Sequence, residues 1–293
     1  MLDIKIRIKG KISAKEESFR FPEAFCELTF EQFTAYHRFL EEEISTGELL
    51  WFFLQGNEEF KAEIPGARIA ELENLLIFIY TEPTPEWYLK YLKIDETELI
   101  GPAAEFSNLI TGEFVFADTY YTEFMKNYSS LRLRSATEEI GSTPLASTSG
   151  ISTPLNDRSP ATEAENNMNK CLAVLMREAD VDADENSSKW KGDKRVIFNE
   201  NHIERRAALI AEVPIEMRLA AIFNYGIIRD LLEKRYIWIF QKSTDEGKNK
   251  NSGWDKVMRS MCFGDITKLN DIFFIPLYTF FDELNDTIKA NSK

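Results

Sequence analysis

The sequence predicts a mainly α-helical protein, built from helical bundle subdomains with a small β-hairpin at its N-terminus. Three observations indicate this fold class. Apolar residues recur at helical spacing through most of the chain. Capping-box patterns mark the starts of two early helices. Charged and apolar residues alternate near the N-terminus, which is typical of a strand with one solvated face.

Length and composition indicate two subdomains. A chain of 293 residues is large for a single hydrophobic core. Its hydrophobic fraction of 44%, with 22 Phe, 10 Tyr and 5 Trp, excludes global disorder. We therefore expect an N-terminal subdomain over 1–134, a linker over 135–160 and a C-terminal helical subdomain over 161–293.

The hairpin is expected from a strand at 3–9, a turn near Gly10 and a return strand that reaches 19–21. Lysines and one arginine alternate with isoleucines in this segment, which favours an exposed sheet edge over a nucleic-acid patch. The formal net charge of −14 would repel a phosphate backbone, so we expect no direct binding to nucleic acid.

The first helix has a doubly specified start. Thr29 and Gln32 have the spacing of a capping box, and Leu28 and Phe33 have that of a hydrophobic staple. We expect the helix to run from about Phe30 to Ile44. A second capping box, Ser45 to Glu48, predicts a short helix that ends at Leu54.

The rest of the N-terminal half alternates helix starts with short extended pieces. Helix starts are expected at Pro65, at Thr84-Pro85-Glu86 and at Thr111, the last leading to about Asn127. Extended pieces are expected around Ile94 and Leu99, ending at Gly101-Pro102.

Residues 135–160 differ sharply in composition, since small polar residues, Gly and Pro dominate the tract. Such a segment cannot bury enough apolar area to offset the entropy of ordering. We expect a linker that is ordered only by a partner protein. The candidate contacts of this tract are Ile140, Leu145, Ile151 and Leu155.

The C-terminal half is expected to be helical. Helices are predicted from Pro160 through Met176, over 200–211, over 215–241 as the longest of all, from Trp254, and over 270–290, with polar loops at 180–195 and 243–253. The surplus of aromatic residues near the end of the 215–241 helix is typical of interface anchors. Core packing explains it equally well. These candidate partner contacts are Tyr225, Tyr236, Trp238 and Phe240.

No motif predicts a catalytic, cofactor or metal site. The acidic run from Asp180 lacks the Gly and Glu that a calcium loop needs at its sixth and twelfth positions. Of the two histidines, His37 is expected to pack among aromatic side chains, and His202 to lie in a helix-capping segment. Zinc-ligand spacings, phosphate-binding glycine loops and a nucleophile elbow are absent from the sequence. A hydrolase with a site that the sequence does not reveal is the alternative to a non-enzymatic protein.

The three cysteines, Cys26, Cys171 and Cys262, predict no disulfide framework and favour a reducing compartment. The N-terminus lacks the apolar core of a signal peptide. The most apolar segment, 220–240, carries five charged residues, so we expect no membrane span.

Several short motifs occur in an order that resembles tail-region or tail-assembly proteins of bacteriophages that infect Bacteroidota. The hairpin is followed by a Pro-x-x-aromatic-x-Glu-Leu-Thr-x-x-Gln helix start. A second helix start, a Leu-Ala-Val-Leu-Met helix and a Pro-hydrophobic-Ala-aromatic pattern come later, and the correspondence spans about residues 1–240. The matching residues are Pro22, Phe25, Glu27, Leu28, Thr29 and Gln32, then Leu109, Thr111, Gly112 and Phe114, then 172–176, then Pro214, Ala221 and Phe223.

This resemblance implies a non-enzymatic role in virion morphogenesis, either as a tail or neck component or as a tail assembly chaperone. It implies other phage structural proteins as partners, leaves a homo-oligomer open, and places the protein in the virion or in the host cytoplasm during assembly. It implies no catalytic residues. The long Ser/Thr/Pro tract and the aromatic helix from about Asn270 depart from the family pattern.

Overall fold

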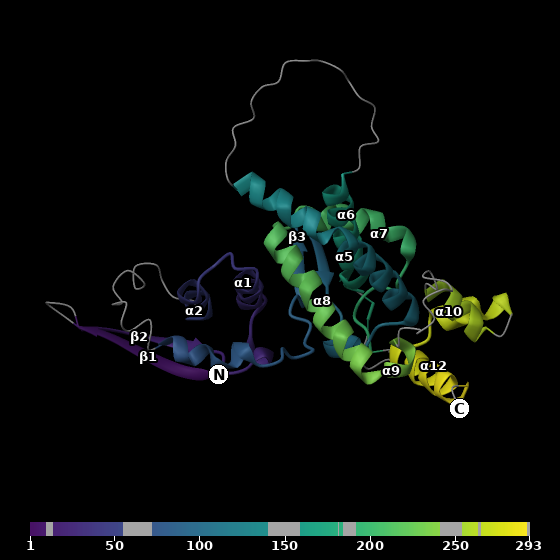
Figure 1. The fold of residues 1–293 in the computed structure, drawn as a ribbon, viewed down its shortest axis with the longest axis horizontal. Helices are drawn as coiled ribbons and strands as arrows, with labels where there is room; N and C mark the ends of the chain where they lie inside the picture. Colours follow the sequence, from purple (N-terminus) through teal and green to yellow (C-terminus); the bar gives the residue numbers. More distant parts are fainter. Residues whose placement is uncertain are drawn as a thin grey trace, which may run out of the picture. The chain divides into compact units, whose positions relative to one another are not determined.

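The computed structural model shows a mainly helical protein with an N-terminal two-stranded hairpin, as the sequence predicts (Figure 1). It divides into two compact units. Unit 1 comprises 1–90, 103–105 and 214–235, and unit 2 comprises 91–102, 106–213 and 236–293. The structure describes residues 1–9, 14–54, 72–139, 159–180, 182–183, 192–240, 254–262 and 265–291.

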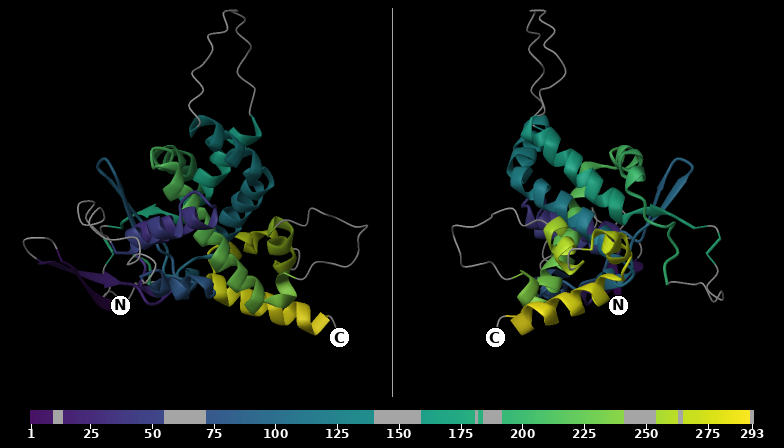
Figure 2. Two further views of the ribbon diagram at one scale, coloured as in Figure 1. Left: turned by 60° about the vertical axis from the view of Figure 1, so that its left-hand side comes forward. Right: turned by 90° about the vertical axis from the view of Figure 1, so that its right-hand side faces the viewer.

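This division differs from the predicted boundary at 135–160. The helices on either side of that tract, α5 (Thr111–Glu139) and α6 (Pro160–Leu175), lie side by side in unit 2 (Figure 2). Residues 135–139 are the last part of α5 rather than loop. Most of the remaining tract lies outside the described residues. Helix packing, not the change in composition, determines which segments share a unit.

Unit 1 begins with the hairpin of β1 (Leu2–Lys9) and β2 (Ala14–Phe21), which pair antiparallel from Leu2 opposite Phe21 to Lys9 opposite Ala14. A short 3-10 turn, η1 (Phe25–Glu27), follows the hairpin. The buried ring of Phe21 lies 6.1 Å from that of Phe53, so the end of β2 contributes directly to the core of unit 1.

Both predicted capping boxes are confirmed. At the start of α1 (Phe30–Leu40), the Thr29 amide donates to Gln32 Oε1 over 2.9 Å and the Gln32 amide donates to Thr29 Oγ1 over 3.2 Å. Before α2 (Thr46–Leu54), the Ser45 amide donates to Glu48 Oε2 and the Glu48 amide donates to Ser45 Oγ. The first helix ends earlier than the expected Ile44, because Glu42 adopts a positive φ of 61°.

The helix predicted at Thr84-Pro85-Glu86 is wrong, since this segment is irregular. Its backbone bonds to a distant side chain instead: the Tyr88 amide donates to Asn224 Oδ1 over 2.9 Å. Asn224 lies on α8 (Ile215–Arg235). Its side-chain amide also donates to the Glu86 carbonyl over 2.8 Å. Upstream, η2 (Asn74–Tyr80) is a 3-10 helix, and the start expected at Pro65 lies outside the described residues.

Unit 2 contains a three-stranded antiparallel sheet. The expected extended pieces form β3 (Tyr91–Ile94) and β4 (Thr97–Ile100), and β5 (Arg177–Glu178) adds to β4. The other described elements of unit 2 are η4 (Glu200–His202), α7 (Ile203–Ile210), α9 (Ile237–Phe240), α10 (Trp254–Met261), η5 (Ile266–Lys268), α11 (Leu269–Phe273) and α12 (Leu277–Asn291). The short turn η3 (Ala104–Phe106) has its first two residues in unit 1 and its last in unit 2.

Three predicted helices have different bounds. The helix from Thr111 continues past Asn127, so α5 with 29 residues is longer than α8 with 21. The expected 215–241 helix is divided at Tyr236 into α8 and α9. The expected 270–290 helix is divided into α11 and α12, because Pro276 lacks the amide that would continue the helical hydrogen bonds.

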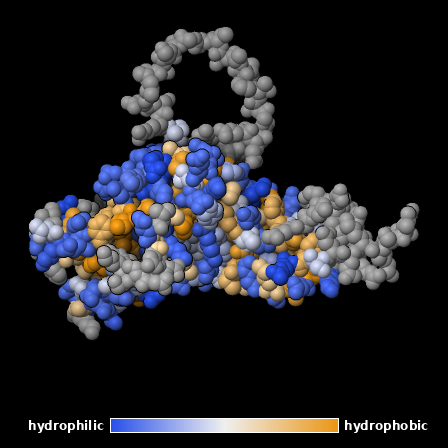
Figure 3. Space-filling model, turned by 180° about the vertical axis from the view of Figure 1, so that it is seen from behind, coloured by the Kyte–Doolittle hydropathy of each residue, from blue (hydrophilic) through white to orange (hydrophobic). Residues whose placement is uncertain are grey.

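No described helix has the length and apolar character needed to cross a membrane. The face drawn in Figure 3 is mostly hydrophilic, in keeping with 29% charged residues, and apolar residues reach it in separate patches. The three cysteines are free thiols, of which Cys26 is exposed and the other two are buried.

Candidate functional site: an apolar groove in unit 2

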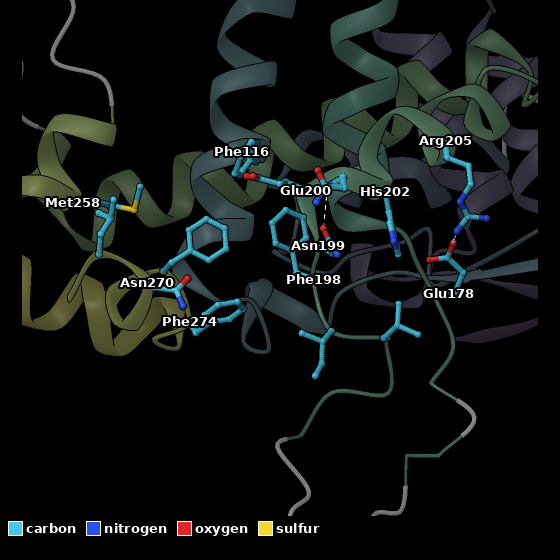
Figure 4. A pocket seen from close by; sticks show the side chains of 15 residues that line it. Phe116, Glu178, Phe198, Asn199, Glu200, His202, Arg205, Met258, Asn270 and Phe274 are labelled. Atoms are coloured by element: carbon cyan, nitrogen blue, oxygen red, sulfur yellow. Dashed lines mark hydrogen bonds and ion pairs between the residues drawn. The ribbon is translucent and has the colours of Figure 1, made fainter. Parts of the chain in front are cut away.

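The described part of unit 2 contains an open groove of about 1000 Å³. One wall comes from the C-terminal helices α10 and α11, and the other from the segment that leads into η4 and α7 (Figure 4). Most of the lining is apolar, with a polar rim at one end. The lining residues are Phe116, Glu178, Val196, Ile197, Phe198, Asn199, Glu200, Asn201, His202, Arg205, Met258, Leu269, Asn270, Phe273 and Phe274.

Three aromatic rings form the base of the apolar part. Phe198 stacks on Phe273 with their ring centres 6.0 Å apart, and Phe116 on α5 contacts both, at 5.8 and 6.2 Å. Phe274 and Ile197 stand at the open side, with exposed fractions of 45% and 75%. Large apolar side chains that are exposed beside a concave surface are typical of binding sites.

Gly112 allows the C-terminal helices to approach α5 closely. A Cβ atom at this position would lie 2.3 Å from Cζ of Phe273, well inside contact distance. The Thr111 amide and hydroxyl also donate to the Ile275 carbonyl, over 2.8 and 3.0 Å. The second helix start, noted for its Thr-Gly pattern, therefore positions one wall of the groove.

The polar end of the groove begins at Glu178 on β5. Its carboxylate pairs with the exposed Arg205 and with Nε of the fully buried Arg206, the latter over 3.1 Å. Arg206 also donates to the Ala173 carbonyl over 2.8 Å. Asn199 accepts from the Asn201 amide over 3.0 Å, which confirms the capping context expected for the segment around His202.

A buried ion cluster lies in the same unit. Nη2 of Arg177 is 2.8 Å from Oε1 of Glu113 and 2.7 Å from Oδ2 of Asp193. Nη2 of Arg195 is 2.9 Å from the same Asp193 oxygen and 3.4 Å from Oε1 of Glu113. Arg177 and Arg195 also donate to the backbone carbonyls of Val196 and Leu175. The cluster thus ties the end of β5, the start of α5 and the groove segment together.

Burial and the neighbouring arginines shift the pKa values of these carboxyl groups in opposite directions. Burial raises the pKa of Glu113, while Arg195 and Arg177 oppose that shift. Burial also acts to raise the pKa of Asp193, but the hydrogen bond and charge of Arg195, with the charge of Arg177, outweigh it and the pKa is lowered. Each charged group is stabilised by its partners rather than by water, which makes the cluster sensitive to the loss of any member.

Sequence reasoning missed both the groove and the cluster. Arg195 falls in a segment that was expected to be a polar loop, yet its side chain is fully buried. Glu113 lies in the helix start expected at Thr111, where its Oε2 accepts from the Ile110 amide over 3.0 Å. A single charged residue in an otherwise apolar helix start is the one signal that could have indicated a buried partner.

The described residues that were predicted to contact a partner differ in burial. Tyr225 is completely buried in α8, and Tyr236 is buried with its hydroxyl 2.9 Å from Asp282 Oδ1. These two side chains belong to the interior, so of the two explanations core packing accounts for them, and they are not available as partner contacts. Phe240 is half-buried against Trp254 and Phe281, and Trp238 is half-buried. Ile140, Leu145, Ile151 and Leu155 lie outside the described residues.

His37 is buried, with its ring centre 5.1 Å from that of Phe223, as the sequence predicts. His202 is exposed and lines the groove near Glu178 and Glu200 (Figure 4). Among the described residues, no group of three or more His, Cys, Asp or Glu side chains could hold a metal ion.

The described lining of the groove contains neither Ser, Thr nor Cys, and it therefore offers no side-chain nucleophile of these types. What the groove can provide is an apolar surface and a few charged groups at one end. No protein-family model, curated protein or solved structure matches this chain.

Proposed function

We propose that this chain is a non-enzymatic bacteriophage morphogenesis protein that acts through protein–protein contacts, as a tail or neck component or as a tail assembly chaperone. The phage role is supported by the order of the short motifs described above. The observation that carries the contact role is the apolar groove, in which Ile197 and Phe274 are exposed.

The make-up of the groove favours a protein ligand over a small polar substrate. Its base is formed by phenylalanine rings, and its charged residues lie at one end, where the carboxylate of Glu178 is already held by two arginines. An open, mostly apolar surface with exposed aromatic and aliphatic side chains is the usual form of a protein-binding site.

A matched pair of substitutions tests this function in the phage that encodes the chain. Ile197 and Ile77 both have side chains that are 75% exposed, but only Ile197 lines the groove. We expect Ile197→Asp to lower the yield of complete particles at least about tenfold, because a carboxylate would be desolvated on contact with a partner. Ile77→Asp should leave the yield close to wild type. Equal yields from both variants would contradict the proposal.

Mass spectrometry of purified virions separates the two phage roles. A tail or neck component is present in fixed proportion to the other virion proteins, whereas a chaperone is absent from the finished particle. Deletion of the gene without any loss of particles would contradict both roles.

A hydrolase is the second candidate, because His202, Glu178 and Glu200 line the same groove. A histidine beside carboxylates can act as a general base. We would then expect the protein to hydrolyse model carboxylic or phosphoric esters and His202→Ala to abolish that activity. Activity that survives this substitution, or no activity in the wild-type protein, would contradict the hydrolase.

A further inference from the structure

The segment 194–197 extends the sheet of unit 2. The Asp180 amide donates to the Lys194 carbonyl over 2.8 Å, and the Val196 amide donates to the Glu178 carbonyl over 2.9 Å. Ala179 and Arg195 form an antiparallel bridge between these two stretches. Of the residues that the structure describes, this segment is therefore the outermost extended piece beside β5.

Ile197 presents its backbone away from β5. In an extended chain, the amide and carbonyl groups of successive residues point to opposite sides, and Val196 uses its amide on the β5 side. Among the described residues, the backbone amide and carbonyl of Ile197 have no hydrogen-bond partner. The chain is still extended two residues later, where Asn199 has φ −141° and ψ 118°. An unpaired, extended edge is the template that added strands use.

Ile197 also lines the apolar groove. Ile197 borders a concave surface that includes Phe273, Phe274 and Met258. A strand that paired with the Ile197 edge would direct every second side chain to one face. An apolar side chain on that face could enter the groove, while its neighbours would stay in solvent.

Glu200 and the net charge of the chain favour a basic ligand. Glu178 is paired with Arg205 and Arg206, but Glu200 is exposed and forms no ion pair among the described residues. The chain as a whole carries a formal charge of −14. Opposite charge at an interface accelerates association and excludes acidic competitors.

We propose that the Ile197 edge binds an extended segment of a partner protein by strand addition, and that this segment alternates apolar and basic residues. This inference deepens the proposed function and rests on it. The backbone pairing supplies a sequence-tolerant part of the affinity, and the groove selects apolar side chains at alternate positions.

The test uses a fluorescein-labelled probe peptide of eight residues, alternating valine and lysine, and measures its fluorescence anisotropy with the full chain. Binding with a dissociation constant below about 1 mM is expected. Methylating the amides of alternate residues, on the edge that pairs, should weaken binding about tenfold, because each lost donor leaves a carbonyl unpaired. A peptide that alternates valine and glutamate should bind more weakly still.

Protein variants locate the site. Ile197→Pro removes the amide that pairs and should weaken probe binding about tenfold, whereas Ile197→Val, which keeps the amide and a branched apolar side chain, should not. Glu200→Gln should weaken binding and reduce its salt dependence. Thermal unfolding of each variant checks that the fold is intact, and the methylated peptide tests the pairing without altering the protein.

Failure of this inference differs from failure of the proposed function. No detectable probe binding, or equal binding of the methylated peptide, would overturn strand addition. If Ile197→Asp still lowered the particle yield in that case, the contact role of the groove would stand. Probe binding with a normal particle yield in Ile197→Asp would leave the strand-binding site and overturn its role in assembly.

Discussion

The interiors of the two units differ in the side chains that fill them. Unit 1 is filled by aromatic side chains: Phe33 stacks on Tyr88 with ring centres 4.2 Å apart, and Phe25 meets Phe78 edge-on at 5.4 Å. Unit 2 also has aromatic contacts, but it buries the ion cluster of Glu113, Arg177 and Arg195 among them. Aromatic packing dominates the first interior, although Arg218 is also buried there, and the second adds a network of matched charges.

This difference predicts different responses to substitution. An apolar core tolerates side chains of similar volume, since dispersion and burial are not directional. A buried ion pair requires both partners, because a charge left without its partner cannot recover its hydration. We therefore expect unit 2 to be the more sensitive to single conservative changes.

Glu113→Gln should have the largest effect on stability. The change removes the charge that faces Arg177 and Arg195 but keeps the shape of the side chain. We expect the free energy of unfolding to fall by about 3–5 kcal/mol, measured by denaturant unfolding followed by circular dichroism. Glu123→Gln is the control, because Glu123 lies on the same helix but forms only an exposed pair with Lys126. Equal effects of the two substitutions would show that the buried cluster contributes no more to stability than an exposed ion pair.

Alkaline pH should act on unit 1 through Tyr88. Burial raises the pKa of Tyr88 to about 12, against 10.0 in the unfolded chain. Between these values the unfolded chain loses a proton that the folded chain keeps, so the free energy of unfolding falls as the pH rises. This difference in pKa corresponds to a loss of about 3 kcal/mol across that window.

Tyr88→Phe isolates this contribution. The variant loses the hydrogen bond from the Tyr88 hydroxyl to the Phe25 carbonyl, and it should be about 1 kcal/mol less stable near neutral pH. Its stability should then fall less steeply than that of the wild type above pH 10, where the free phenol begins to ionise. Parallel stability curves for the two proteins would show that Tyr88 titrates normally.

Gly112→Ala tests the close packing of the start of α5 against Phe273 in unit 2. The new methyl group would overlap the ring of Phe273, so the ring and the wall of the groove must move. We expect a loss of roughly 1–3 kcal/mol in the free energy of unfolding. Adding Phe273→Leu should recover part of this loss, since a smaller side chain leaves room for the methyl group. Additive losses in the double variant would show that the two residues are not coupled.

Thr29→Ala should have the smallest effect. It removes the acceptor of the Gln32 amide at the start of α1 and should lower the free energy of unfolding by about 1 kcal/mol. Ser45→Ala makes the same change at the exposed start of α2 and provides the comparison. A change near zero for Thr29→Ala would mean that the capping box contributes nothing to unit 1.

The local features of this protein could be predicted from its sequence. The hairpin, both capping boxes, the short strands around Ile94 and Leu99, and the burial of His37 follow from neighbouring residues, because caps, turns and periodic apolar faces act over a few positions. The local prediction failed where a distant residue supplies the hydrogen bonds. The side chain of Asn224 bonds to the backbone of Glu86 and Tyr88, and the segment after Thr84 is not helical.

Only the tertiary structure decided which segments share a core and where a ligand could bind. The ion cluster joins residues at 113, 177, 193 and 195, and the groove joins α5 to helices that follow residue 254. Sequence alone determined the helical class and the starts of α1, α2, α5 and α6, since those depend on short-range hydrogen bonds and spacing. It could not determine the groove, because the burial of Arg195 and the exposure of Ile197 depend on chain segments brought together by folding.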